Sequence, residues 1–194
     1  MHRAILHPLF VTTSLVALAE IGDKTQILSL LLAARYRRPA PIILGVLGAT
    51  VLSNGLAAGL GDILARVLTP AILNWAVLLS FVAMGLWIMI PDKLRENDLP
   101  LRSAAGVFMA TLMSYFLAEM GDKTQIATVA LAARFQEWLP VVAGTTFGMM
   151  LANIPAIVFG HRFADRLPVR WIHAIAAVFF LVLGGLALRR ALEG

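Results

Sequence analysis

The sequence predicts an all-α, polytopic membrane protein with six transmembrane helices, arranged as two inverted three-helix repeats. Hydrophobic residues make up 60% of the 194 residues, charged residues 14%, and the mean hydropathy is +0.85. Soluble domains carry about 25% charged residues. Six apolar segments each approach or exceed the length of about 20 residues that a helix needs to cross a bilayer. One charged segment also occurs twice, 99 residues apart.

The predicted spans follow one another through short connections. They cover residues 9–34, 41–64, 70–90, 103–133, 140–163 and 169–188. The most polar connection, 92–102, separates a first three-helix repeat, 1–91, from a second, 103–194. The first apolar run resembles a signal peptide, but its counterpart in the second repeat is internal, so we expect the mature protein to retain it.

The two halves align without a gap when the chain is shifted by 99 residues. The matching positions include Pro41 and Pro140, Gly45 and Gly144, Asn54 and Asn153, and Gly61 and Gly160. A match of this length indicates an internal duplication. Three spans per repeat is an odd number, so the halves should enter the membrane in opposite directions. Inverted repeats of this kind place the substrate site near the midplane, where the halves meet.

Basic residues gather on one side of this topology. That side carries Arg35, Arg37, Arg38, Lys93, Arg95, Arg102, Arg162, Arg166 and Arg170, and the other carries Arg3, Arg66, Arg134, Arg189 and Arg190. The richer side should be cytoplasmic, which puts both termini outside. Because these residues lie in connections, we expect the chain, with its net charge of +5, to partner the lipid bilayer and not nucleic acid. The sequence does not indicate an oligomeric state.

The repeated charged segments lie inside predicted spans. We call residues 20–26 (EIGDKTQ) the first acidic segment and residues 119–125 (EMGDKTQ) the second. A charge near the bilayer centre costs from about 2.5 to over about 10 kcal/mol, so these carboxylates need a partner or a function. On a continuous helix, residues three and four apart share a face, which would stack each Glu over its Asp. If the two helices face each other, oxygen atoms from both segments converge.

Such an all-oxygen site suits a hard divalent cation such as Mn²⁺ or Ca²⁺. The chain has no cysteine, which excludes disulfides, zinc–thiolate sites and thiol catalysis, and we expect neither a cofactor nor enzymatic activity. The predicted metal ligands are Glu20, Asp23, Thr25, Gln26, Glu119, Asp122, Thr124 and Gln125. The candidates for a supporting layer around the metal are Lys24, Lys123, Asn54 and Asn153.

Several of these residues have two interpretations. Each lysine would pair with its own Glu or Asp in the metal-free state, or point toward the membrane interface. The two asparagines would support the metal or form hydrogen bonds between helices. Gly22 and Gly121 would allow close packing or a local departure from helical geometry. The spacing of Gly55 and Gly59, and of Gly144 and Gly148, favours packing. The histidines have no repeat partner of the same type and receive no function: His2, His7, His161 and His173.

The two Glu-x-Gly-Asp-Lys-Thr segments, each in the first span of a three-helix half, resemble those of the cation/proton antiporters first grouped as uncharacterised protein family 0016, which includes Golgi transmembrane protein 165. The resemblance extends over essentially the whole chain. It implies transport of Mn²⁺ or Ca²⁺ against protons, with Mn²⁺ export in bacterial relatives and a place in the inner membrane. The family's acidic residues correspond to Glu20, Asp23, Glu119 and Asp122. Preference for Mn²⁺ over Ca²⁺ rests on the resemblance alone.

The expected mechanism is exchange. Metal binds from the cytoplasm as protons leave the crowded carboxylates, the halves rock, and external protons displace the metal. A divalent cation channel is an alternative, because acidic rings also select cations. An intramembrane aspartyl protease is a weaker one, since Glu20 and Glu119 replace the first glycine of the protease motif and no Tyr-Asp pair exists. A scaffold whose buried charges fix helix register is a third.

Overall fold

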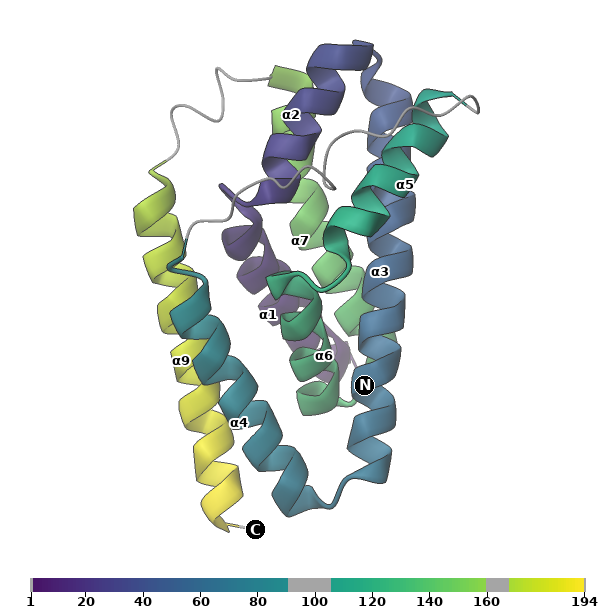
Figure 1. Cartoon of the computed structure of the whole chain (residues 1–194). Coiled ribbons are helices and arrows are strands. Elements are labelled where there is room, and N and C mark those ends of the chain that lie inside the picture. The colour runs from purple at the N-terminus through teal and green to yellow at the C-terminus, as the bar shows by residue number, and fades with distance from the viewer. Residues whose placement is uncertain (1, 91–105, 160–167, 194) are drawn as a thin grey trace.

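A computed structural model describes residues 2–90, 106–159 and 168–193, and this part of the chain folds into eight helices (Figure 1). They are α1 (His2–Glu20), α2 (Lys24–Tyr36), α3 (Pro39–Val67), α4 (Pro70–Trp87), α5 (Val107–Glu119), α6 (Lys123–Phe135), α7 (Trp138–Phe159) and α9 (Val169–Glu193). The all-α prediction is confirmed for these residues. The connection 92–102 and the predicted span ends at 103 and 163 lie outside them.

The first and fourth predicted spans are each divided in two by an acidic segment. Gly22 has φ +84° and Gly121 has φ +76°, in the left-handed region that glycine adopts without a Cβ penalty. The following residues, Asp23 and Asp122, begin α2 and α6 with nearly identical backbone angles, φ −78° and ψ 167° against φ −79° and ψ 164°. The prediction of continuous helices that stack Glu over Asp is therefore wrong. Of the two interpretations of these glycines, the departure from helical geometry is the one observed.

Four helices are long and apolar enough to cross a membrane: Pro39–Val67, Pro70–Trp87, Trp138–Phe159 and Val169–Arg189. α5 is a shorter apolar helix. Large apolar side chains are exposed along the long helices, for example Leu56 at 61% and Phe147 at 63%. A water-soluble protein seldom exposes apolar surface on this scale, and a bilayer would cover it. The prediction of six spans is thus confirmed in part.

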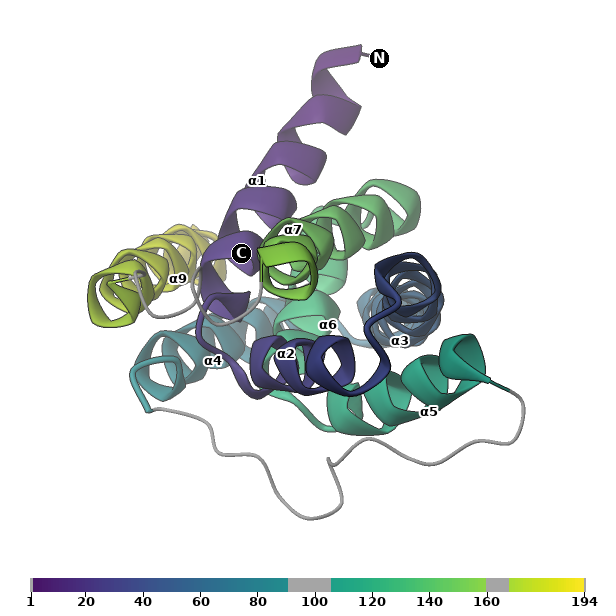
Figure 2. The same ribbon diagram turned by 90° about the horizontal axis from the view of Figure 1, so that it is seen from above.

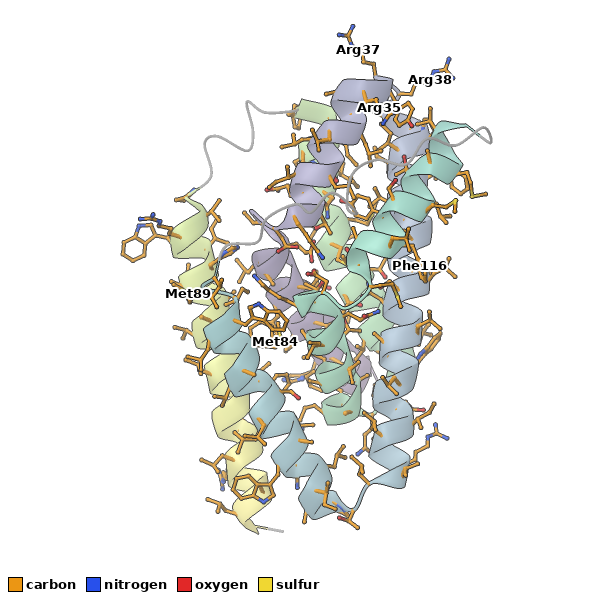
Figure 3. The ribbon with its side chains drawn as sticks, in the orientation of Figure 1. Arg35, Arg37, Arg38, Met84, Met89 and Phe116 are labelled. Atoms are coloured by element: carbon orange, nitrogen blue, oxygen red, sulfur yellow. The ribbon has the colours of Figure 1, made fainter. Side chains whose placement is uncertain are left out.

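The two divided helices run in opposite directions through the protein. In Figure 1, α1 and α2 run upward and α5 and α6 run downward. Seen from above, α2 and α6 lie at the centre, with α3, α4, α7 and α9 around them (Figure 2). The side chains of Arg35, Arg37 and Arg38 lie at the upper end (Figure 3), and the C-terminus lies at the lower end. The acidic segments lie between these two ends of the bundle, and the first one packs beside the start of α9.

Glycines bring the long helices close to the divided ones in the same way in both halves. A Cβ on Gly45 of α3 would lie 2.7 Å from Thr111 Cβ of α5, and one on Gly144 of α7 would overlap Thr12 of α1. These two pairs are related by the 99-residue shift. Gly148 also meets α1, so the packing role predicted for Gly144 and Gly148 is confirmed. Close backbone approach at small residues is typical of helix packing in membranes.

Candidate functional site

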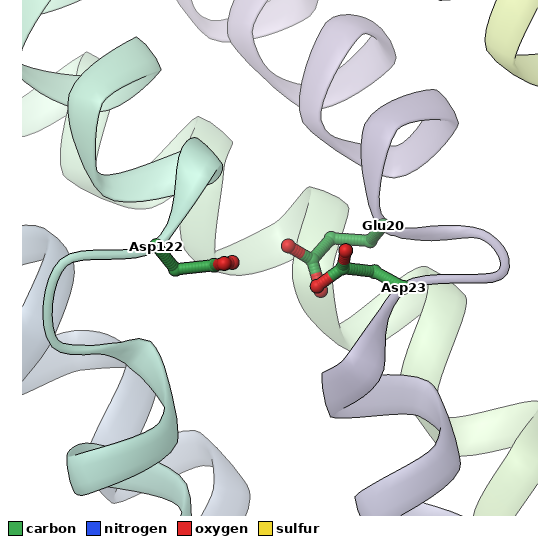
Figure 4. A group of neighbouring side chains, drawn as sticks. All are labelled: Glu20, Asp23 and Asp122. Atoms are coloured by element: carbon green, nitrogen blue, oxygen red, sulfur yellow. The ribbon is translucent and has the colours of Figure 1, made fainter. Parts of the chain in front are cut away.

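Three buried carboxylates gather where the two helix breaks meet. Glu20, Asp23 and Asp122 each offer an oxygen that lies within 4.8 Å of the others (Figure 4). Their exposed fractions are 0%, 4% and 5%. Glu20 ends α1, and each Asp is the residue before the next helix, so the breaks themselves aim these side chains at one point. The predicted convergence of carboxylates from both acidic segments is present in the structure.

Glu119, the fourth predicted carboxylate, is buried at 1% exposure but is not part of this group of three. It interacts electrostatically with Glu20 and Asp122. Among the described residues, Oε1 of Glu119 and Oε1 of Glu20 have no hydrogen-bond partner. A buried carboxylate oxygen without a donor is costly unless a cation or a proton compensates it.

The threonine hydroxyls donate to carboxylates. Thr25 Oγ1 donates to Glu20 Oε2 at 2.6 Å, and Thr124 Oγ1 donates to Asp122 Oδ2 at 3.2 Å. The two contacts are not equivalent, because Thr25 binds the Glu of its segment and Thr124 binds the Asp. Thr124 also lies beside the Glu20 carboxylate. In this arrangement the hydroxyls orient the carboxylates.

The glutamines hold the two breaks. Gln26 Oε1 accepts from the backbone N–H of Gly22 at 2.9 Å, and Gln125 Oε1 accepts from Gly121 at 2.7 Å. Their amide nitrogens differ. Gln26 Nε2 donates to the Ala152 carbonyl of α7 at 3.1 Å, whereas Gln125 Nε2 lies 3.7 Å from Met120 Sδ. Both amide oxygens therefore satisfy a backbone donor that the break leaves outside a helix.

The two lysines lie in different surroundings. Lys24 Nζ forms an ion pair with Asp122 Oδ1 at 3.3 Å, and Lys123 Nζ donates to the Ile90 carbonyl at 2.7 Å. Lys24 thus pairs with the Asp of the other acidic segment, which neither of the two predicted arrangements anticipated. The breaks explain this pairing, because they place Asp122 opposite the start of α2. An ammonium group here partly compensates the buried negative charge.

The asparagines form hydrogen bonds between helices. Asn153 Oδ1 accepts from Ser29 Oγ of α2 at 3.0 Å, and Asn54 Nδ2 donates to Thr146 Oγ1 of α7 at 3.3 Å. Both asparagines therefore form hydrogen bonds between helices, as one of their two interpretations predicted. Asn153 also lies beside Glu20, so a supporting role next to the carboxylates stays a prediction.

Sequence reasoning missed two polar residues. Tyr115 Oη, fully buried, lies 2.7 Å from the Thr25 carbonyl and 2.8 Å from Asn153 Oδ1, and it contacts Ser29 Oγ. His173 Nε2 of α9 lies 2.6 Å from the Ile21 carbonyl inside the first break. Neither has a residue of its type 99 positions earlier, where the sequence has Val16 and Asn74. Comparing the halves therefore gave no signal for either residue.

The site offers several carboxylate oxygens in a buried, apolar part of the protein, together with an ammonium group from Lys24. Hard divalent cations prefer oxygen ligands of this kind. The same oxygens bind protons, so protons and a metal ion compete for the cluster. Reversible binding of a divalent cation is the chemistry that this arrangement supports.

Comparison with known proteins agrees with this chemistry. A family model described as "Divalent cation/proton antiporter GDT1" matches residues 8–96 and again residues 107–194. A Vibrio cholerae protein named "Putative manganese exporter" is 47% identical over 180 residues, covering 92% of this chain and 89% of its own.

More distant relatives extend the same likeness. A GDT1-like protein of Synechocystis is 30% identical, covering 86% of this chain and 89% of its own, and GDT1-like protein 3 of Arabidopsis thaliana is 28% identical, covering 92% and 69%. No solved structure matches. The resemblance inferred from the paired acidic segments is confirmed, and the family is one of transporters, not of enzymes. The chain belongs to the GDT1 family of divalent cation/proton antiporters.

Proposed function

We infer that this protein exports Mn²⁺ from the cytoplasm in exchange for protons, across a bacterial inner membrane. The single observation that carries this proposal is the gathering of carboxylates from both acidic segments within 4.8 Å of one another. A cation bound between Glu20, Asp23 and Asp122 is held by both halves of the chain, so relative movement of the halves can change its access. The name of the Vibrio cholerae relative supports Mn²⁺ over Ca²⁺ and export over import.

Charge balance supports a definite stoichiometry. The two acidic segments bring four buried carboxylates, and Lys24 and Lys123 bring two ammonium groups. When all are ionised, two negative charges remain in a region of low dielectric, where uncompensated charge is costly. One divalent cation or two protons cancel them. We therefore expect electroneutral exchange of one metal ion for two protons.

Lys24 gives the exchange a simple order. Without metal, its ammonium group lies against Asp122, and an arriving cation competes with it for that carboxylate. Lys24 must then move away from the metal, since like charges repel in a buried site. When no metal is bound, the ammonium group of Lys24 therefore compensates part of the negative charge of the carboxylates. This lowers the free-energy cost of the metal-free state.

Two inverted repeats supply the movement. α1 with α2, and α5 with α6, each act as one divided span, which gives three spans per half and the two domains 1–91 and 103–194. Divided helices at the midplane and repeats of opposite direction are typical of secondary transporters. The arginine-rich end marked by Arg35, Arg37 and Arg38 lies at the cytoplasm and both termini lie outside, following the positive-inside rule (Figure 3).

Purified protein in liposomes tests the proposal. Mn²⁺, Ca²⁺ and Mg²⁺ are presented in turn while internal pH and metal uptake are followed with and without a voltage clamp by valinomycin and K⁺. We expect Mn²⁺ to move protons in the opposite direction, with no dependence on membrane voltage. Metal flux without proton movement would indicate a channel, and a flux that depends on voltage would contradict the stoichiometry.

A further inference from the structure

The first turns of α9 cover the first helix break, and we propose that His173 is a positioning residue for the acidic site. Val169 and His173, which we call the α9 clasp, lie four residues apart and therefore on one face of the helix. α9 packs beside α1 (Figure 2). The clasp thus joins the last helix of the second half to the break that positions Glu20 and Asp23 in the first. Its role in transport rests on the proposed function.

The hydrogen bond of the clasp is short and partly buried. His173 is 7% exposed, and its Nε2 lies 2.6 Å from the Ile21 carbonyl. A carbonyl oxygen only accepts, so Nε2 carries the hydrogen and donates. Ile21 lies next to Glu20, just past the end of α1. Leaving its carbonyl without a donor in an apolar region costs about 1–3 kcal/mol.

Val169 adds a steric contact at the neighbouring residue. A Cβ on Gly22 would overlap Val169 Cγ1 and lie 3.1 Å from Cγ2. The side chain of Val169 therefore fills the space that a glycine leaves above the break. Together, the two clasp residues contact both residues between Glu20 and Asp23, namely Ile21 and Gly22.

The second break provides the internal control. Among the described residues, nothing lies within 4 Å of a Cβ placed on Gly121, and Met120 is 51% exposed. In both segments the glycine N–H binds the glutamine and the Asp N–H binds the Glu carbonyl, at 3.1 Å in each case. These two hydrogen bonds are the same in both segments, and among the described residues only the first segment is covered by α9.

Loss of the clasp should therefore allow the first break to sample other conformations. If only a fraction of molecules holds Glu20 and Asp23 correctly, the apparent metal affinity falls by that fraction while bound metal still crosses at its usual rate. This predicts a change in KM with little change in kcat. A residue that serves folding alone would instead lower the amount of active protein.

Three variants test the proposal in liposomes. His173→Leu removes the donor, His173→Gln keeps an amide N–H at similar reach, and Asn74→Leu changes the matching position in α4. We expect His173→Leu to raise the KM for Mn²⁺ about tenfold, the factor that corresponds to 1.4 kcal/mol, with kcat within about twofold. His173→Gln should restore the wild-type KM, and Asn74→Leu should leave it unchanged. A wild-type KM in His173→Leu, failure of the glutamine to rescue, or an equal effect from Asn74→Leu would overturn the proposal.

Hydrogen exchange of purified protein without metal separates this inference from the proposed function. Amides of residues 20–26 should exchange more slowly than those of 119–125, and His173→Leu should speed exchange in the first segment about tenfold while leaving the second unchanged. If the protein fails to exchange metal for protons in liposomes, the proposed function fails, and this measurement still decides the clasp. Equal exchange in both segments of the wild type would overturn it.

Discussion

The two acidic segments have the same backbone and different surroundings. Both bend at a glycine with positive φ, both begin the next helix at Asp with angles that agree within 3°, and both hold the bend with a glutamine. The first is covered by α7 and α9, whereas the second borders an open apolar pocket of about 320 Å³ that includes Met120 and Gln125. Local sequence therefore sets the bend, and the packing of the long helices sets what each bend contacts.

The largest effect should come from the carboxylates that link the two segments. Glu20→Gln or Asp122→Asn removes a charge from the proposed metal site, and disrupting a buried charged group costs about 3–5 kcal/mol, so metal-driven proton movement should fall at least about 100-fold. Liposome assays measure it. Asp62→Asn is the matched control, because Asp62 pairs with Arg66 away from the site. Wild-type exchange in either site variant would contradict the claim that carboxylates from both acidic segments act together.

The next effect concerns the ion pair between the halves. Lys24→Met removes the ammonium that lies against Asp122, so Mn²⁺ no longer competes with it and should raise the melting temperature of the variant more than that of the wild type. Thermal unfolding in detergent, with and without Mn²⁺, measures the difference. Lys123→Met should have the smaller effect, since Lys123 donates to the Ile90 carbonyl. Equal Mn²⁺-induced shifts in melting temperature for the two lysine variants would contradict a special role for the ion pair between Lys24 and Asp122.

Alanine substitutions at Gly22 and Gly121 test whether α9 covers only the first helix break. Both Gly22→Ala and Gly121→Ala place a Cβ at positive φ, which costs roughly 1–2 kcal/mol. Only Gly22→Ala also overlaps Val169, and overpacking adds about 1–3 kcal/mol. Gly22→Ala should therefore melt at the lower temperature, and Val169→Ala should rescue it without helping Gly121→Ala. Equal losses in the two glycine variants would show that α9 does not cover the first break.

The smallest effect should come from Tyr115, whose matching position in the first half is Val16 and has no hydroxyl. Tyr115→Phe removes contacts to the Thr25 carbonyl and Asn153 and should cost about 1 kcal/mol. For a chain of this size that is a decrease of about 2–4 °C in melting temperature. Val16→Leu, at the matching position, tests packing without a hydrogen bond. An unchanged melting temperature in Tyr115→Phe would remove this hydroxyl from the contacts that stabilise the first segment.

Much of the fold could be predicted from the lengths of the apolar segments and from the 99-residue duplication, because both are patterns in the sequence itself. The breaks were only one of two interpretations of Gly22 and Gly121, because Glu20 and Asp23 also fit the spacing of one continuous helix. Yet Gly followed by Asp is a signal for a helix start, since glycine disfavours the helix interior and Asp favours its N-cap. That signal was available and was outweighed by the apolar run on either side.

The clustering of Glu20, Asp23 and Asp122 could be predicted from the sequence, whereas the contacts around them could not. The carboxylates follow from charge placed inside apolar spans, which is unusual enough to mark a function. The partner of Lys24, the donor that reaches Ile21 and the contacts of Tyr115 all depend on which helices pack together. Such contacts join residues far apart in the chain, and a single sequence carries no local signal for them.

Locating the bound metal tests the central claim most directly. Anomalous scattering at the manganese edge, from crystals grown with Mn²⁺, identifies the ion and its ligands. We predict one ion within about 2.0–2.6 Å of carboxylate oxygens from both acidic segments, including Glu20 or Asp23 and Asp122. An ion held by one segment alone, or bound elsewhere in the chain, would contradict a site shared between the halves.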